Sequence, residues 1–220
     1  MPLDDTAPQL DALLLGTVLE MELSPRDNQV ASKRYNLIPE HLQRPNSPIR
    51  GYMENALVYP QGSRAIGATI VHGADDDRFD LDAILEFRTP PGWTPRRVLD
   101  ELHAAFEGFP DVKKIERCTR CIQLQFAFMH LDVTPMDPDR DPRAERVGEI
   151  YHSADEGRDE RFRVNPYGFG QDFKARITMP SRSFQDHVGD VRSKLQMKDR
   201  LAPGTIMADA DIDALPEPID

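Results

Sequence analysis

The chain has 220 residues and carries 38 acidic against 27 basic residues, which gives a formal net charge of −11. Its content of 39% hydrophobic and 30% charged residues is that of a globular protein, not of a membrane-embedded or disordered one. The overall field repels polyanions, which argues against a long nucleic-acid partner and against binding to an anionic membrane surface. Small phosphate ligands stay possible, because they respond to local charge and to metal ions.

The N-terminal sequence MPLDDTAPQL lacks the marks of a secretory signal, since it has no basic residue followed by a long apolar stretch. The apolar run at residues 12–15 is far too short to cross a bilayer. Two cysteines, Cys118 and Cys121, are too few for a disulfide framework. We therefore expect a cytoplasmic protein with no membrane partner.

The first predicted elements are two helices. Residues 9–22 place apolar side chains along one helical stripe, and Ser24 followed by Pro25 has the form of an N-cap with proline in the first turn. The second helix continues to about Leu42, and the Asn-Ser-Pro sequence at residues 46–48 ends it.

Strands and a further helix follow. A short strand is predicted at residues 56–59, before the polar, glycine-containing segment 61–64. Residues 78–88, RFDLDAILEFR, indicate a buried strand. A Thr-Pro pair opens a helix over residues 94–106, and residues 121–133 predict one long strand that ends close to a proline.

The rest of the chain is more polar. Residues 137–160 hold nine acidic and four basic residues without periodicity, which predicts an exposed loop or flap. Residues 174–200 reverse this balance and favour a helix. The predicted fold class is α+β (mixed α/β), with a sheet flanked by helices in residues 1–200 and an acidic, proline-containing tail in residues 201–220.

The strongest chemical signal is a pair of carboxylates in the predicted strand 78–88. Asp80 and Asp82 stand two residues apart, so both side chains leave the same face of the strand. Two like charges this close are costly unless a cation lies between them, and Mg²⁺ prefers such hard oxygen ligands. An Asp-x-Asp pair is more often simply solvated, but the apolar residues around this one make a pure solubility role awkward.

A third carboxylate and a glycine-serine pair complete the pattern. Asp132 lies near the end of another apolar strand and could complete a two-metal site with the first pair. Gly62 and Ser63 follow a predicted strand, where glycine lets backbone amides approach a phosphate and serine adds a donor. Each signal is weak alone, but the combination is specific.

These segments resemble a known family. YPQGSRAIGATIV, FDLDAILEF and HLDVTP are similar to the nucleotidyltransferase superfamily that includes DNA polymerase beta. More closely, they resemble the bacterial cyclic-oligonucleotide synthases, the CD-NTases, which are relatives of cyclic GMP-AMP synthase and oligoadenylate synthetase. The resemblance runs from about Tyr35 to the C-terminus. One departure is Gly67-Ala68-Thr69, where the family often has Gly-Thr.

The resemblance implies a polymerase-beta-like core and assigns its site residues. Asp80, Asp82 and Asp132 would be the catalytic, metal-binding carboxylates, with Mg²⁺ or Mn²⁺ as cofactor. The segment Gln61-Gly62-Ser63 would bind the nucleotide phosphates. The implied reaction joins nucleoside triphosphates into a cyclic di- or trinucleotide messenger for antiviral defence, with release of pyrophosphate. A downstream effector that senses the product would be an indirect partner.

Three further residues carry open alternatives. The resemblance extends to the segment around Asn165, whose amide could contact a base or ribose, but an Asn-Pro turn without a ligand is equally expected. Cys118 and Cys121 could form half of a zinc site, although a structural role is the more common one for such cysteines. His130 should share the strand face of Asp132, in a supporting or packing role.

Two other functions compete with the cyclic-nucleotide synthase. A nucleotidyltransferase of the same fold could transfer a nucleotide to a protein or an RNA, as an adenylylating antitoxin does. A non-catalytic binding module has no positive support, because all three aspartates are present. The family normally continues into a helical lobe, so the ending ADADIDALPEPID is expected to lead toward that lobe. The lobe would then come from another chain, or the form is truncated, or a minimal variant works without it.

Overall fold

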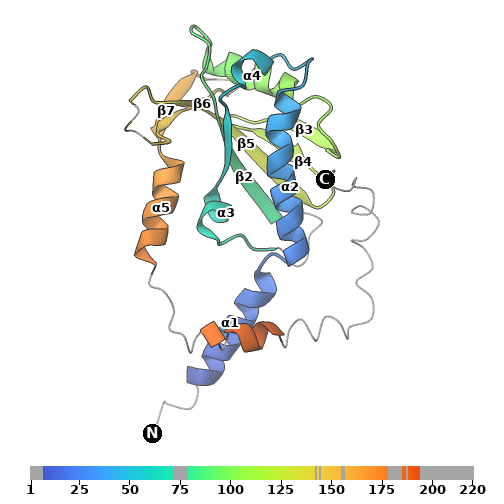
Figure 1. Ribbon diagram of the computed structural model, residues 1–220, viewed down its shortest axis with the longest axis vertical. Coiled ribbons are helices and arrows are strands. Elements are labelled where there is room, and N and C mark those ends of the chain that lie inside the picture. The colour runs from blue at the N-terminus through green and yellow to red at the C-terminus, as the bar shows by residue number, and fades with distance from the viewer. Residues whose placement is uncertain are drawn as a thin grey trace. The chain divides into compact units, whose positions relative to one another are not determined.

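The computed structural model describes residues 7–71, 79–141, 143, 145–154, 157–177, 185–186 and 188–193 (Figure 1). The chain divides into two compact units, one formed by Met1–Glu20 with Met179–Asp220 and the other by Met21–Thr178. The main described element of the first unit is helix α1 (Ala7–Met21), which confirms the helix predicted at residues 9–22. The tail at residues 201–220 lies outside the described residues, so the predicted domain boundary stays a prediction.

The second unit contains two of the other predicted helices, each opened as its sequence indicates. In α2 (Pro25–Leu42) the Ser24 hydroxyl accepts a hydrogen bond from the Asp27 amide at 3.0 Å. In α4 (Pro95–Ala105) the Thr94 hydroxyl accepts one from the Arg97 amide at 3.2 Å. Both helices bury an apolar stripe, which explains why helical periodicity identified them. A short 3₁₀ helix, η1 (Arg50–Tyr52), follows the break after α2.

A seven-stranded mixed sheet forms the body of the second unit (Figure 1). Its strands are β1 (Leu57–Gln61), β2 (Phe79–Glu86), β3 (Lys114–Arg117), β4 (Ile122–Gln125), β5 (Met129–Pro138), β6 (Gly148–His152) and β7 (Glu160–Val164). The order is β1-β2-β5-β4-β3, and β6 pairs with the second half of β5 and with β7. Among the strand pairs of the described residues, only β2–β5 is parallel. The predicted mixed α/β class is thus confirmed.

The predicted long strand at residues 121–133 is wrong. The segment forms two antiparallel strands, β4 and β5, and the chain reverses between them where the Phe126 amide donates to the Met129 carbonyl at 2.9 Å. The turn has no glycine or proline, and Phe126 is buried, so the apolar alternation runs through it without interruption. Pattern alone could not separate one long strand from a tight hairpin.

The predicted loop at residues 137–160 is also wrong, because β5 extends to Pro138 and this region contains β6 and the start of β7. Strand β7 is a charged edge strand with nearly all of its side chains exposed, so it has no apolar face to reveal it. The sequence reading also missed α3 (Gly62–Ile66) and α5 (Pro166–Arg176). The helix predicted within residues 174–200 is confirmed in part, because residues 185–186 and 188–193 are helical. Residues 174–176 instead end α5, and most of the remaining range lies outside the described residues.

The sheet separates an apolar face from a polar one. Leu81, Ala83 and Leu85 alternate with Asp80 and Asp82 along β2, and the three apolar side chains are almost fully buried. Strand β5 repeats this division, with buried Leu131 and Val133 on either side of Asp132 in the sequence. The fold therefore presents the carboxylates on the face opposite these core residues.

Candidate active site

The three predicted aspartates lie on neighbouring strands and on one face of the sheet. Asp82 of β2 is the register partner of Asp132 of β5. Two strand positions earlier, Asp80 is the partner of His130. Because side chains two residues apart leave a strand on the same side, all four polar groups share one surface. The structure thus brings the predicted carboxylates together and confirms the shared face of His130 and Asp132.

The same register adds polar neighbours that the sequence reading did not single out. Gln123 of β4 is the partner of Asp132, and Gln125 is the partner of His130. On the other side, Gln61 of β1, which the family resemblance had already assigned to phosphate binding, is the partner of Asp82. A row of polar side chains therefore crosses four strands, which only the strand order could reveal.

The electrostatics of this row are those of an uncompensated acidic cluster. The pKa of Asp82 is raised, first by burial and then by the charges of Asp132 and Asp80. Atom Oδ1 of Asp132 is buried and accepts no hydrogen bond in the described part of the chain. The His130 imidazole is a neighbour of this row, with its Nδ1 3.8 Å from Oδ1 of Asp80. Carboxylate oxygens are the hard donors that Mg²⁺ prefers.

The side chains are not gathered around a single point. Within the described ranges, no three His, Cys, Asp or Glu side chains are grouped closely enough to hold a metal ion. The Asp80 side chain is 69% exposed and points into open surroundings. Mutual repulsion among three carboxylates accounts for this spread, and a bound cation would have to draw them together.

The predicted phosphate loop begins α3 and lies directly against Asp82. Gly62 has a φ of +58°, a conformation that favours glycine. A Cβ atom at this position would also collide with the Asp82 carboxylate, so the backbone can lie this close only without a side chain. The Ser63 hydroxyl lies 3.3 Å from the Thr69 hydroxyl. The glycine therefore brings Ser63 and the start of α3 next to the acidic row.

Helix α2 supports the site from behind. The Tyr35 hydroxyl donates a hydrogen bond of 2.9 Å to the backbone carbonyl of Asp82. Burial raises the pKa of this phenol, so it remains a donor at neutral pH. Nothing in the sequence pattern singled out Tyr35, because its partner is a backbone atom 47 residues away.

The cysteine pair lies at the edge of the acidic row. Cys118 and Cys121 are free thiols that flank the turn between β3 and β4, where the Cys118 amide donates to the Cys121 carbonyl at 2.9 Å. Burial and then the Asp132 charge raise the pKa of Cys121. The two thiols are therefore neighbours of a predicted catalytic carboxylate, and the described residues offer them no third ligand for zinc.

Asn165 has a structural role as a helix cap. The sequence left open whether it contacts a nucleotide or only forms a turn. Its side-chain oxygen accepts a 2.7 Å hydrogen bond from the Gly168 amide and thereby caps α5. Helix α5 contacts α3, and Gly170 lies against Ala65. The cap thus fixes the start of a helix that packs beside the predicted phosphate loop.

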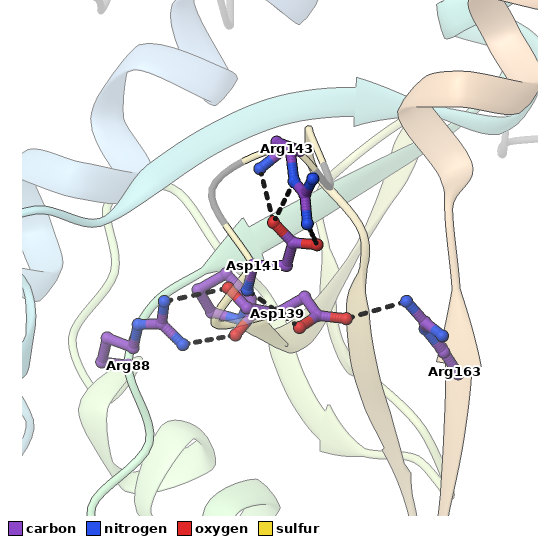
Figure 2. A network of polar contacts seen from close by, with 6 residues as sticks. Arg88, Asp139, Asp141, Arg143 and Arg163 are labelled. Carbon is purple, nitrogen blue, oxygen red and sulfur yellow. Dashed lines mark hydrogen bonds and ion pairs between the residues drawn. The ribbon is translucent and has the colours of Figure 1, made fainter.

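A second polar cluster lies on the other face of the sheet. Asp137 follows Asp132 by five residues on β5, so its side chain points away from the acidic row. It helps to line a pocket of about 430 Å³. Figure 2 shows the network beside this pocket, in which Arg88 donates to the Asp139 carbonyl at 3.0 Å and Arg163 pairs with the Asp139 carboxylate at 2.8 Å. These ion pairs are separate from the candidate site.

Sequence comparison finds one matching family and one relative. Residues 14–166 match the model of a family described as the Second Messenger Oligonucleotide or Dinucleotide Synthetase domain, a range that includes every predicted site residue. The chain is 40% identical over 185 residues to the cyclic dinucleotide synthase CdnG of Bradyrhizobium diazoefficiens, a match that covers 82% of this chain and 43% of that protein.

Structure comparison gives a consistent result. The B. diazoefficiens CD-NTase CdnG in complex with GTP superimposes with a TM-score of 0.73 at 34% identity, over 86% of this chain and 53% of that one. The CdnC chain of the E. coli MS115-1 CdnC:HORMA-deltaN complex shares the fold alone, with a TM-score of 0.52 at 15% identity over 76% of this chain and 50% of that one. The chain thus spans about half the length of these relatives. No described helix has the length and apolar character needed to cross a membrane.

Proposed function

Since the chain belongs to the family of second messenger oligonucleotide or dinucleotide synthetases, the bacterial CD-NTases, we propose that it joins nucleoside triphosphates into a cyclic dinucleotide or trinucleotide and releases pyrophosphate. The observation that carries this proposal is the register pairing of Asp82 with Asp132, with Asp80 two residues away on the same face. The GTP bound to the B. diazoefficiens relative supports a purine nucleoside triphosphate as substrate.

The carboxylates Asp80, Asp82 and Asp132 would hold Mg²⁺, or Mn²⁺ in its place. Three observations support this fit: the orphaned buried oxygen of Asp132, the raised pKa of Asp82, and hard oxygen donors on one face. A divalent cation bound there would supply Lewis-acid stabilisation of the charge that develops during phosphoryl transfer.

The protein groups around the carboxylates would bind and orient the substrates. The amides at Gly62 and the hydroxyl of Ser63 would donate hydrogen bonds to the triphosphate, because the glycine brings this backbone against Asp82. Gln61, the register partner of Asp82, would contact the same phosphates. Asp132 would lie beside the ribose hydroxyl that attacks the α-phosphate. The amide nitrogen of Asn165, whose oxygen is used in the cap, would contact a base or ribose.

The proposed setting follows from the proposed product. A cyclic nucleotide carries no information unless another protein binds it, so a downstream effector would sense the product, and we place this signalling in cytoplasmic antiphage defence. The acidic net charge of −11 weighs against a long nucleic acid as the acceptor. The helical lobe expected from the family would close over the nucleotides, whether from this chain or another.

The test is to incubate the chain with all four ribonucleoside triphosphates and Mg²⁺ or Mn²⁺, and to identify products by mass spectrometry. We expect a small, phosphatase-resistant cyclic nucleotide together with pyrophosphate, and neither from the Asp82→Asn variant. Label transferred to the protein itself or to added RNA, without a small product, would overturn the proposal in favour of a transferase that modifies macromolecules.

A further inference from the structure

The guanidinium of Arg146 contacts two tyrosine rings from different parts of the chain. Its central carbon is 4.7 Å from the ring centroid of Tyr59 on β1 and 5.0 Å from that of Tyr167 on α5. The two rings lie 6.2 Å apart at a steep angle to each other. These two cation–π contacts join the β5–β6 connection, strand β1 and helix α5 at one point.

The polar edge of this guanidinium is enclosed. Atoms Nε and Nη1 of Arg146 are buried and donate to no acceptor in the described part of the chain. Nη1 lies 4.0 Å from the Glu86 carboxylate, which itself accepts a 3.3 Å hydrogen bond from the Tyr59 hydroxyl. Burying a cationic group without hydrogen bonds is costly, so the contacts with the two rings and the Glu86 charge must hold the guanidinium in place.

The backbone conformation of Arg146 is independent evidence that the position of this residue is constrained. Its φ is +51°, and it is one of two non-glycine residues with positive φ in the described part of the chain. An L-residue adopts this conformation only when the surrounding contacts require it. The strain is consistent with a side chain that is directed toward a particular position.

The three partners of Arg146 each belong to a segment that carries candidate site residues. Tyr59 comes two residues before Gln61 on β1, and Tyr167 comes two residues after Asn165. Glu86 is on β2, the strand of Asp80 and Asp82. Helix α5 also contacts α3, which begins at Gly62. One side chain therefore connects the phosphate loop, the carboxylate strand and the Asn165 cap.

We propose that Arg146 is a positioning residue that holds the Asn165 segment at the start of α5 against β1 and thereby sets the affinity for the nucleoside triphosphate. This inference rests on the proposed function for its substrate. Arg146 need not touch the nucleotide, since its buried edge faces protein. It acts through Tyr59 and Tyr167, so its loss should loosen binding more than it slows chemistry.

The test compares Arg146→Gln and Arg146→Lys with the wild-type chain, using GTP with Mg²⁺ as the probe. Both substitutions keep an L-residue at positive φ, so the backbone strain is matched and the comparison isolates the side chain. Loss of two aromatic contacts should raise the KM for GTP about five- to tenfold, with kcat changed less than about twofold. Lysine keeps the charge but not the planar group, so it should restore less than half of the lost affinity.

A matched control is available in the same chain. Arg97 of α4 stacks on Trp93 at 4.8 Å, which is the same kind of contact in a part of the fold that carries no site residue. Arg97→Gln should leave the KM unchanged even if it lowers the melting temperature as much as Arg146→Gln does. An equal KM change in both variants, or none in either, would overturn the proposal.

A second readout does not depend on turnover. The amides of Gly168 and Phe169 donate to Asn165 at 2.7 and 3.0 Å and report whether the start of α5 is fixed. Arg146→Gln should speed their hydrogen exchange about tenfold, while Arg97→Gln should not. If the wild-type chain makes no cyclic product, the proposed function fails, but exchange and equilibrium GTP binding still test the positioning role. Unchanged exchange in Arg146→Gln would show that role to be wrong.

Discussion

Asp82 and Asp132 are register partners on adjacent parallel strands, and their carboxylates leave the sheet on the same side. This pairing is specific to β2 and β5, because no other described strand pair is parallel. Strand β2 also carries Asp80. Removing a carboxylate charge should therefore change activity and stability in different ways.

Replacing either paired carboxylate should abolish turnover without unfolding the chain. We expect Asp82→Asn and Asp132→Asn each to lower product formation by at least about 10²- to 10³-fold, because each removes a ligand from the proposed cation site. Mass spectrometry of the product measures this loss, and circular dichroism checks the fold. Asp100→Asn, a change on the exposed surface of α4, is the control. Full turnover by folded Asp82→Asn would refute the site.

The same Asp82→Asn change should make the folded chain more stable at neutral pH. The pKa of Asp82 is raised in the folded state by burial and by Asp132 and Asp80. Its charged form therefore disfavours folding, and stability is lost as the pH rises through the raised pKa. Asparagine carries no charge at any pH, so the variant should be more stable than wild type at pH 7 in the presence of a chelator. This difference should vanish below the unfolded-state pKa of Asp82, where the wild-type carboxyl is also neutral.

Urea unfolding at several pH values measures this difference, and adding Mg²⁺ should reduce it by stabilising the wild-type chain. A variant less stable than wild type at pH 7 would contradict the electrostatic account.

Alanine substitutions at two glycines with similar backbone conformations distinguish the effect of backbone strain from the effect of a steric contact. Gly62 and Gly67 have φ values of +58° and +75°, but an added Cβ meets the Asp82 carboxylate only at Gly62. Gly67→Ala should cost about 1–2 kcal/mol of stability and leave turnover nearly intact. Gly62→Ala should cost at least as much and also lower turnover about a hundredfold, because it displaces Asp82. Equal turnover in both variants would show that the close approach has no functional role.

The Cys121 thiol offers a chemical probe of the acidic row. It lies close enough to Asp132 for that charge to raise its pKa. The raised pKa and burial make this thiol a slow nucleophile, so it has to be labelled with excess iodoacetamide at alkaline pH. Alkylation of Cys121 should then crowd Asp132 and lower product formation at least tenfold, by roughly the effect of misplacing a catalytic group. Mass spectrometry gives the extent of labelling, and Cys121→Ser should be resistant while Cys118→Ser remains sensitive. Full activity in a chain fully alkylated at Cys121 would contradict this geometry.

The sequence was sufficient for those parts of the fold that depend on local pattern. Ser24–Pro25 and Thr94–Pro95 marked helix starts correctly, and the strand of Asp80 and Asp82 was predicted within two residues of its ends. The hairpin at residues 126–128 and the edge strand β7 were not predictable, since neither has a break or an apolar face of its own.

The site residues also divide into those that a local pattern predicts and those that depend on long-range contacts. Spacing singled out Asp80 and Asp82, because residues two apart on a strand must share a face, and Asp132 was predicted from its place near the end of another apolar strand. Other relationships came from strand order and long-range contacts: Gln123 beside Asp132, Tyr35 hydrogen-bonded to Asp82, and Arg146 in contact with Tyr59 and Tyr167. No local pattern contains such pairings, which depend on segments far apart in the chain.

Strand β5 pairs with three other strands, β2 along one edge and β4 and then β6 along the other. A single-residue insertion between Met129 and Asp132 would turn the Asp132 carboxylate into the core and shift its register against β2. Evolution can therefore lengthen or shorten the connection after Pro138, but it must keep the length of β5 fixed up to Asp132. Among relatives of this chain, insertions and deletions should be found in the β5–β6 connection and be absent from residues 129–132.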